Sequence, residues 1–437
     1  MTDTERLHLT SRWDLALVPA GESVDRGLLV DVHAPPGATS AVRRPVNLVL
    51  VLDRSSSMGG PPMAAVIEAA YGVIGAMDER DRLAVVCFDH EVDVIAPPRR
   101  MTADARDAAR TAVRALEARG STDLAGGWFQ GAECASAMLA DGSERHAHVV
   151  VLSDGQANRG LQNPEELVEH AAALAARGVT TSAVGVGRNY SASQLEALAR
   201  GGEGRLNHCD HGEDIVDVIL GELMDERETV AQQLTLTLRA PAGLELTLLS
   251  ALPHEPTPGG LRIRLGNLRA GAERSAALLA TTEAPTLGES LPIAIEASWT
   301  DPETSRTETA EAPAATLRGA TDAEVDAAPR DLEVAERILD LWEASLAYQG
   351  TRMHAAARYE EASSTVKSAE GRIDRFAQGT TRMRQRRQQR ESLSRLVASA
   401  AWDAADSRTT MDVSRKALRQ DADRRRDQKG SWRDSLG

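Results

Sequence analysis

Cysteine is scarce in this chain of 437 residues, and its spacing fits neither a disulfide framework nor a paired-cysteine zinc site. We expect Cys87, Cys134 and Cys209 to be buried thiols, as in a protein of a reducing compartment. No apolar run is long enough to span a bilayer. The first residues, MTDTERLHLTSRWD, are acidic and polar where an export signal would have a basic start and an apolar middle. These absences favour a cytoplasmic protein with no membrane contact.

Lysine is nearly missing as well. The chain has Lys367, Lys416 and Lys429, and no lysine precedes position 367. This excludes a phosphate-binding loop lysine, a kinase strand lysine and a Schiff-base lysine from most of the chain. The formal net charge of -15 disfavours a nucleic-acid partner, because phosphate binding needs a basic surface. The arginine-rich residues 372–395 contain a single aromatic, Phe376, and are interpreted as a solvated helix face that pairs with acidic groups. Abundant arginine and alanine are typical of a GC-rich bacterial source.

The order of apolar segments predicts an α/β domain. Between residues 45 and 228, short apolar strands alternate with amphipathic helices, and the first strand, PVNLVLVLD, is apolar almost throughout. Such strands are buried on both faces of a sheet. The pattern predicts a doubly wound, mostly parallel sheet of Rossmann-like type, covered by helices on both faces.

Segments on either side of this domain are predicted to be strands. Residues 5–40 contain two strand-like runs bounded by Gly, Pro and Ser. After Thr229, five runs between residues 231 and 300 alternate apolar and polar side chains with the two-residue period of antiparallel strands, separated by Pro and Gly turns. Because each set alone would make a thin sheet, we predict that residues 1–44 and 229–318 form one discontinuous β-sandwich, into which the α/β domain of residues 45–228 is inserted. Residues 321–437 are predicted to be a helical region with a frayed tail.

Three polar segments occur where α/β sheets place their ligands, at or near the carboxyl ends of strands. They are Asp53-Arg54-Ser55-Ser56-Ser57, Gly120-Ser121-Thr122-Asp123 and Ser153-Asp154-Gly155. Oxygen ligands without thiol or imidazole suit a hard cation such as Mg²⁺ or Mn²⁺ and argue against zinc. The alternative is that these residues only form turns and helix caps, as they do in many proteins. We favour a metal site because chance rarely places three such turns in this order.

The pattern DxSxS, followed by a Gly-x-Thr-Asp-like segment and then SDG, resembles the von Willebrand factor type A (VWA) domain and its metal-ion-dependent adhesion site. The resemblance covers residues 45–228. It implies that Ser55 and Ser57 ligate the metal directly, that Thr122 is a third direct or switchable ligand, and that Asp53 and Asp154 hold metal-bound waters. It also implies that a Glu or Asp of a partner protein fills the open position.

The chain departs from the pattern of this family at one loop position and resembles a wider group of proteins in its architecture. Ser56 stands where many family members have glycine, which puts the close approach of this loop in question. Beyond the α/β domain, the order of strands, VWA core, strands and helices resembles bacterial VWA proteins related to inter-alpha-trypsin-inhibitor heavy chains. This second likeness is one of architecture and involves no motif.

Other candidate sites are weaker. The segment Asn207-His208-Cys209-Asp210-His211 lacks a second ligand segment and is interpreted as a polar turn rather than a zinc site, and His146 and His148 are interpreted in the same way. A GxSxG nucleophile elbow and a GxGxxG phosphate loop are both missing from the sequence.

These features favour a non-enzymatic, Mg²⁺-dependent adaptor that binds an acidic residue of a partner protein. We expect it to act in an intracellular bacterial assembly, such as an ATPase-linked, signalling, stress or defence system. One alternative is a metal-dependent hydrolase, for which the sequence offers no general base beyond the carboxylates of the metal site. The other alternative is a surface adhesin.

Overall fold

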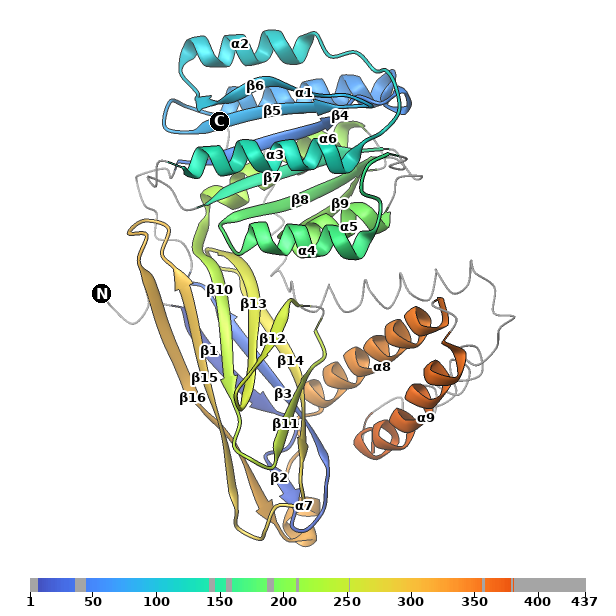
Figure 1. The fold of residues 1–437 in the computed structure, drawn as a ribbon. Coiled ribbons are helices and arrows are strands. Elements are labelled where there is room, and N and C mark those ends of the chain that lie inside the picture. The colour runs from blue at the N-terminus through green and yellow to red at the C-terminus, as the bar shows by residue number, and fades with distance from the viewer. Residues whose placement is uncertain are drawn as a thin grey trace.

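The computed structural model describes residues 7–35, 45–140, 146–154, 159–186, 192–209, 212–250, 252–355, 358–378 and 380. Within these ranges the strands form three sheets, one in an α/β domain and two in a β-sandwich (Figure 1). None of the helices in these ranges has the length and apolar character needed to cross a membrane. Predictions for Gly155, for His211 and for most of the arginine-rich segment lie outside the described residues.

The α/β domain contains a six-stranded sheet in the order β6-β5-β4-β7-β8-β9. Its strands are β4 (Asn47–Asp53), β5 (Arg82–Phe88), β6 (Val92–Arg100), β7 (Ala147–Ser153), β8 (Val179–Val186) and β9 (Glu203–Cys209). All neighbours pair in parallel except β5 and β6, which pair antiparallel. The predicted doubly wound, mostly parallel fold is confirmed, and β6 is an additional antiparallel edge strand that was not predicted.

Helices cover both faces of this sheet. One face packs against α1 (Pro61–Ala76), α2 (Ala103–Arg114) and α6 (Gly212–Arg227). The other packs against α3 (Leu124–Leu139), α4 (Pro164–Ala175) and α5 (Ala192–Gly201). Every residue of β4 is buried, because this strand lies in the middle of the sheet between two helical layers. The loops that follow β4 and β7 therefore start from rigid, neighbouring positions.

The β-sandwich is built from both flanking segments. Its smaller sheet has the order β1 (His8–Trp13), β3 (Asp25–His33), β14 (Glu273–Thr282) and β11 (Leu244–Leu248). The larger has the order β12 (His254–Thr257), β13 (Gly260–Arg269), β10 (Thr229–Arg239), β15 (Ser290–Thr300), β16 (Thr307–Ala320) and β2 (Leu17–Pro19). The strand β3 pairs with β14, and β2 pairs with β16, so strands from before and after the α/β domain share both sheets. The exact domain boundaries stay a prediction.

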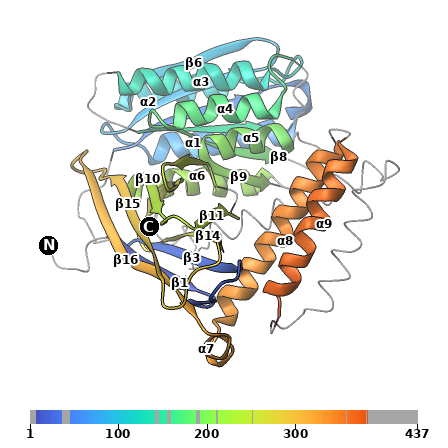
Figure 2. The ribbon, with the colours of Figure 1, turned by 60° about the horizontal axis from the view of Figure 1, so that its bottom comes forward.

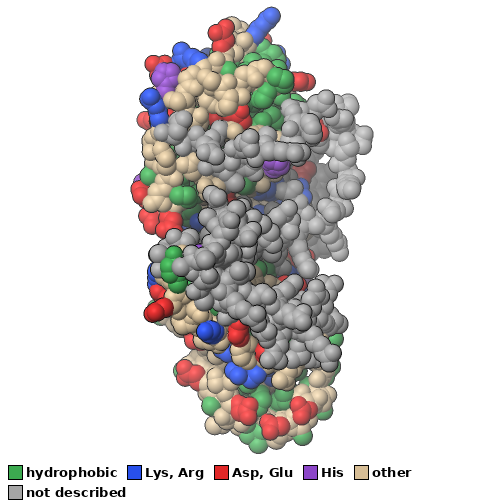
Figure 3. Space-filling model, turned by 90° about the vertical axis from the view of Figure 1, so that its right-hand side faces the viewer, with side chains coloured by type: hydrophobic (Ala, Val, Ile, Leu, Met, Phe, Trp, Pro, Cys, Tyr) green, Lys and Arg blue, Asp and Glu red, His purple; other side chains and the backbone are tan. Residues whose placement is uncertain are grey.

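The C-terminal region begins with α7 (Asp322–Ala327) and continues as a hairpin of α8 (Leu332–Ala355) and α9 (Tyr359–Phe376). The hairpin packs on the outer face of the smaller sheet through apolar contacts that include Leu29 and Ile338 (Figure 2). Gly27 allows this close approach, because a Cβ atom there would lie 2.7 Å from Ile338 Cγ1. On the face seen in Figure 3, acidic side chains gather at the end of the sandwich away from the α/β domain.

Candidate metal site

The loop after β4 begins with a buried carboxylate. Asp53 is fully buried, and its Oδ1 accepts a hydrogen bond from the Ser55 backbone N–H at 2.7 Å. Its Oδ2 accepts one from the Ser153 hydroxyl at 2.5 Å, across the neighbouring strands β4 and β7. Burial raises the pKa of Asp53 to about 6, although these hydrogen bonds act in the opposite direction. The carboxylate is thus held in place but poorly compensated for its charge.

From Ser55, hydroxyl groups lead outward to a second carboxylate. Ser55 is buried, and its Oγ lies 3.1 Å from Oγ of the exposed Ser57. Ser57 in turn donates a hydrogen bond of 2.7 Å to Asp154 Oδ1. Burial raises the pKa of the half-buried Asp154. Four of the predicted site residues therefore form one row, from the interior at Asp53 to the surface at Asp154.

The loop that contains Gly120 and Thr122 lies against the loop of Ser55, Ser56 and Ser57 that follows β4. The backbone N–H and the hydroxyl of Ser56 both donate to the carbonyl of Gly120, at 3.2 and 3.0 Å. Gly120 has a positive φ of 73°, which favours glycine at this turn. Thr122 is buried, two residues further along. Serine at position 56 does not keep the loops apart, since its exposed side chain bonds the facing loop.

The residues present fit a hard divalent cation. All five predicted side chains offer oxygen, from three hydroxyls and two carboxylates. The 3.1 Å between the Ser55 and Ser57 oxygens matches neighbouring ligands of an octahedron with metal–oxygen bonds of about 2.1 Å, whose edge is about 3.0 Å. Both carboxylates have raised pKa values because of burial, so a cation placed between them would offset a charge that the fold leaves uncompensated.

A second group of possible metal ligands, Asp89, His90 and Glu91, lies nearby. Asp89 Oδ2, however, accepts hydrogen bonds from Nε of Arg54 at 3.1 Å and of Arg119 at 2.7 Å. Although burial alone would raise it, the pKa of Asp89 is lowered by the Glu91 backbone N–H and by these two guanidinium groups. Arginine already supplies the positive charge here, so the group is an ion-pair network rather than a metal site.

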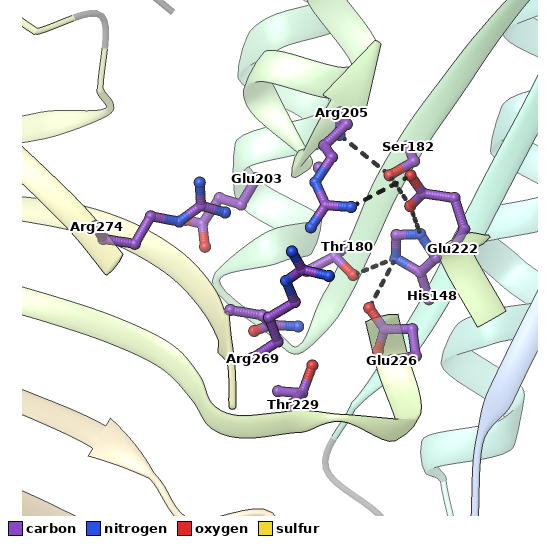
Figure 4. Close-up of a pocket in the computed structure, with 12 residues that line it drawn as sticks. His148, Thr180, Ser182, Glu203, Arg205, Glu222, Glu226, Thr229, Arg269 and Arg274 are labelled. Carbon is purple, nitrogen blue, oxygen red and sulfur yellow. Dashed lines mark hydrogen bonds and ion pairs between the residues drawn. The ribbon is translucent and has the colours of Figure 1, made fainter. Parts of the chain in front are cut away.

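The interpretation of His146 and His148 as polar turns is wrong. Both are buried, and His148 lies within β7, where its Nε2 is 3.3 Å from Glu222 Oε2 and its Nδ1 is 2.7 Å from Thr180 Oγ1 (Figure 4). His146 Nδ1 lies 3.1 Å from Glu226 Oε2. A sequence signal for this pairing exists: His146 and His148 have the two-residue spacing of one face of an extended segment, and Glu222 and Glu226 have the four-residue spacing of one helix face. The pairing was not predicted because the histidines and the glutamates are more than 70 residues apart in the sequence.

This histidine–glutamate cluster lies where the α/β domain meets the sandwich. His146 Nε2 is 2.9 Å from Asn267 Nδ2 of β13, and Arg264 Nε is 3.3 Å from Glu203 Oε1. A polar cavity of about 40 Å³ opens beside His148, which is room for a few water molecules. It lies at the amino end of β7, whereas Asp154 follows its carboxyl end. The cluster is therefore separate from the candidate metal site.

The segment Asn207–Cys209 was also interpreted as a turn and instead ends β9. Asn207 Nδ2 donates to Glu222 Oε1 at 2.9 Å, so its amide belongs to the same cluster. Cys87, Cys134 and Cys209 are all buried, as predicted.

Comparisons with known proteins identify a known domain in part of this chain. A family model for the von Willebrand factor type A domain matches residues 47–214. An uncharacterized protein of Synechocystis sp. is 29% identical over 206 residues, which cover 46% of this chain and 47% of that protein. Human inter-alpha-trypsin inhibitor heavy chain H3 is 28% identical over 194 residues, covering 41% of this chain and 20% of that one. The chain thus spans less than half the length of either relative.

The likeness to a solved structure extends over nearly the whole chain. A von Willebrand factor type A protein from Catenulispora acidiphila superposes with a TM-score of 0.64 at 17% identity, covering 95% of this chain and 98% of that one. At this identity the match supports the fold alone. It agrees with the predicted α/β domain combined with a sandwich and C-terminal helices.

Proposed function

Residues 47–214 form a VWA domain, and from this premise we propose that the chain is a non-enzymatic, Mg²⁺-dependent binding protein that captures an acidic side chain of a partner protein. The observation that carries the proposal is the row of oxygens from Asp53 through Ser55 and Ser57 to Asp154. It is oxygen-only, ordered, buried at one end and open to the surface at the other.

Each residue has a role in this proposal. The hydroxyls of Ser55, Ser57 and Thr122 would hold Mg²⁺, or Mn²⁺ in its place, directly, and Asp53 and Asp154 would hold it through water. Bound in this way, the cation would supply a Lewis-acidic position for an incoming carboxylate. Because the direct protein ligands are neutral, a carboxylate from the partner gains a charge-strengthened bond there. Exposure of Ser57 leaves the outer end of the row within reach of another protein.

The setting that we propose is an intracellular bacterial assembly, with the sandwich and helical hairpin orienting the VWA domain. Buried thiols at Cys87 and Cys134 are in keeping with a reducing compartment. A hydrolase would need a general base beside the metal, and the neighbouring carboxylate of Asp89 is a poor one, because two guanidinium groups lower its pKa. A surface adhesin would use the same oxygen row and differ in location, which cell fractionation decides.

The proposal is tested by affinity capture from the native lysate with the full chain as bait. A partner should be retained in Mg²⁺ and released by EDTA, and Ser55→Ala should fail to retain it while keeping the wild-type circular dichroism. Ser136→Ala is the matched control, since the Ser136 hydroxyl donates to Ala132 of its own helix. Partners held equally by wild type and Ser55→Ala, or held equally in EDTA, would contradict metal-mediated capture. Turnover of phosphoester or peptide substrates in Mg²⁺ would favour the hydrolase instead.

A further inference from the structure

Asp89 connects the two loops that carry the predicted ligands. It follows β5 directly and is fully buried. Its Oδ2 accepts from Nε of Arg54 and from Nε of Arg119, at 3.1 and 2.7 Å, while its Oδ1 accepts from the Glu91 backbone N–H at 2.6 Å. One carboxylate thus anchors a side chain from each loop.

The backbones of the same loops are bonded to one another around this carboxylate. Arg119 N–H donates to the carbonyl of Arg54 at 2.7 Å. The carbonyl of Asp89 accepts from the Asp123 backbone N–H at 2.8 Å. Since Arg54 lies between Asp53 and Ser55, and Thr122 immediately precedes Asp123, these bonds fix residues adjacent to the predicted ligands on both loops.

Charge attraction does not explain why Arg54 and Arg119 lie beside a candidate cation site. A guanidinium group near a divalent cation repels it. Here the repulsion is reduced because Arg54 Nη2 lies 2.5 Å from Asp93 Oδ2 and Arg119 Nη2 lies 2.9 Å from Glu91 Oε2. The two arginines fix the positions of their loops, because each is held by the buried carboxylate of Asp89 and by an outer acidic residue.

We propose that Asp89 is a positioning residue of the metal site, acting through Arg54 and Arg119. It holds the loop of Ser55 and Ser57 against the loop of Thr122, so the hydroxyls are in place before the cation binds. Ligand sets fixed in this way bind metal more tightly, and loss of such outer contacts typically lowers metal affinity by about 10–100-fold. This inference rests on the proposed function, because it concerns the same oxygen site.

The test is a titration of the full chain with Mn²⁺, in which electron paramagnetic resonance measures the concentration of the free ion. Arg119→Gln is the informative variant, since its side chain is half exposed and the fold should survive its loss. Repulsion alone predicts that removing this positive charge tightens Mn²⁺ binding, whereas positioning predicts binding weaker by about tenfold. Arg80→Gln is the control, because it removes the same charge at the opposite end of β5, where Arg80 pairs with Asp78.

A second variant, Asp89→Asn, should weaken Mn²⁺ binding at least as much as Arg119→Gln. In the double variant the losses should overlap instead of adding, because both changes break one linkage. Arg119→Gln that binds Mn²⁺ as tightly as wild type, or more tightly, overturns the positioning role while leaving the metal site intact. Wild-type protein that binds no Mn²⁺ overturns the metal site itself, and the positioning role with it.

Discussion

Replacing Asp53 by asparagine should stabilise the metal-free protein and remove its response to Mg²⁺. Burial raises the pKa of Asp53 from 3.8 to about 6, so the folded state disfavours the ionised carboxylate. A raised pKa means that stability is lost as pH rises from the unfolded value through the folded one. Well above pH 6 the folded protein carries the full penalty of the buried charge, and the rise of this pKa from 3.8 to about 6 corresponds to about 3 kcal/mol.

Asparagine removes this penalty at a smaller cost. Its amide oxygen can still accept from the Ser55 N–H, while its NH₂ group replaces the acceptor of the Ser153 hydroxyl and costs about 1 kcal/mol. The net expectation near neutral pH is a gain of about 1–2 kcal/mol in the free energy of unfolding in EDTA. Near pH 4 the gain should vanish, because the wild-type carboxyl group is then largely protonated in the folded state.

The assay is urea-induced unfolding of both proteins in EDTA and in excess Mg²⁺. Mg²⁺ at about 100 times its dissociation constant should stabilise the wild type by about 2.7 kcal/mol and leave Asp53→Asn unchanged. The order of stability should therefore reverse between the two conditions. The reasoning is refuted if Asp53→Asn is the less stable protein in EDTA, or if Mg²⁺ stabilises both proteins equally.

Two further predictions concern the other parts of the fold. Desolvation lowers the pKa of buried His148, but Glu226 and Glu222 outweigh this effect and raise that pKa. Burial would raise the pKa of Glu222, but the hydrogen bond from His148 and the charge of Arg205 lower it to about 2. The cluster should therefore lose stability as pH rises above about 6.5 and as it falls below about 4.5. In urea unfolding across pH, His148→Gln should remove the alkaline decline, and an unchanged decline would contradict this role. Gly27→Ala should cost on the order of 1–3 kcal/mol through its clash with Ile338 and speed amide exchange in α8, whereas unaltered exchange would mean that the hairpin packs otherwise.

The sequence was most informative where local pattern and tertiary position agree. The apolar run of β4 could only be a central strand, and the alternating strands on either side of the α/β domain needed one another as partners. The edge strand β6 escaped notice because Pro97 and Pro98 argue against a strand, although an edge position tolerates them. The long β16 was missed because Thr307–Ala320 contains five alanines and no valine, isoleucine, phenylalanine, tyrosine or tryptophan, so it shows no clear alternation of apolar and polar side chains.

The candidate metal ligands could be predicted from the sequence, but the residues that hold their loops in place could not. Asp53, Ser55 and Ser57 share one short motif, so their proximity follows from the chain itself. The contact of Asp89 with Arg54 and Arg119 spans 35 and 30 residues and involves charged types that occur throughout the sequence. Such pairs become visible only when the sheet order and the loop paths are known.

Metal binding by the serine hydroxyls is best tested by a crystal structure of the full chain grown with Mn²⁺, in which anomalous scattering locates the ion. We expect an anomalous peak at bonding distance, about 2.1–2.2 Å, from the hydroxyl oxygens of Ser55 and Ser57, with Asp154 within reach of a bound water. A peak at Asp89 and Glu91 instead, or Ser57 still bonded to Asp154 with no ion between the loops, would contradict it.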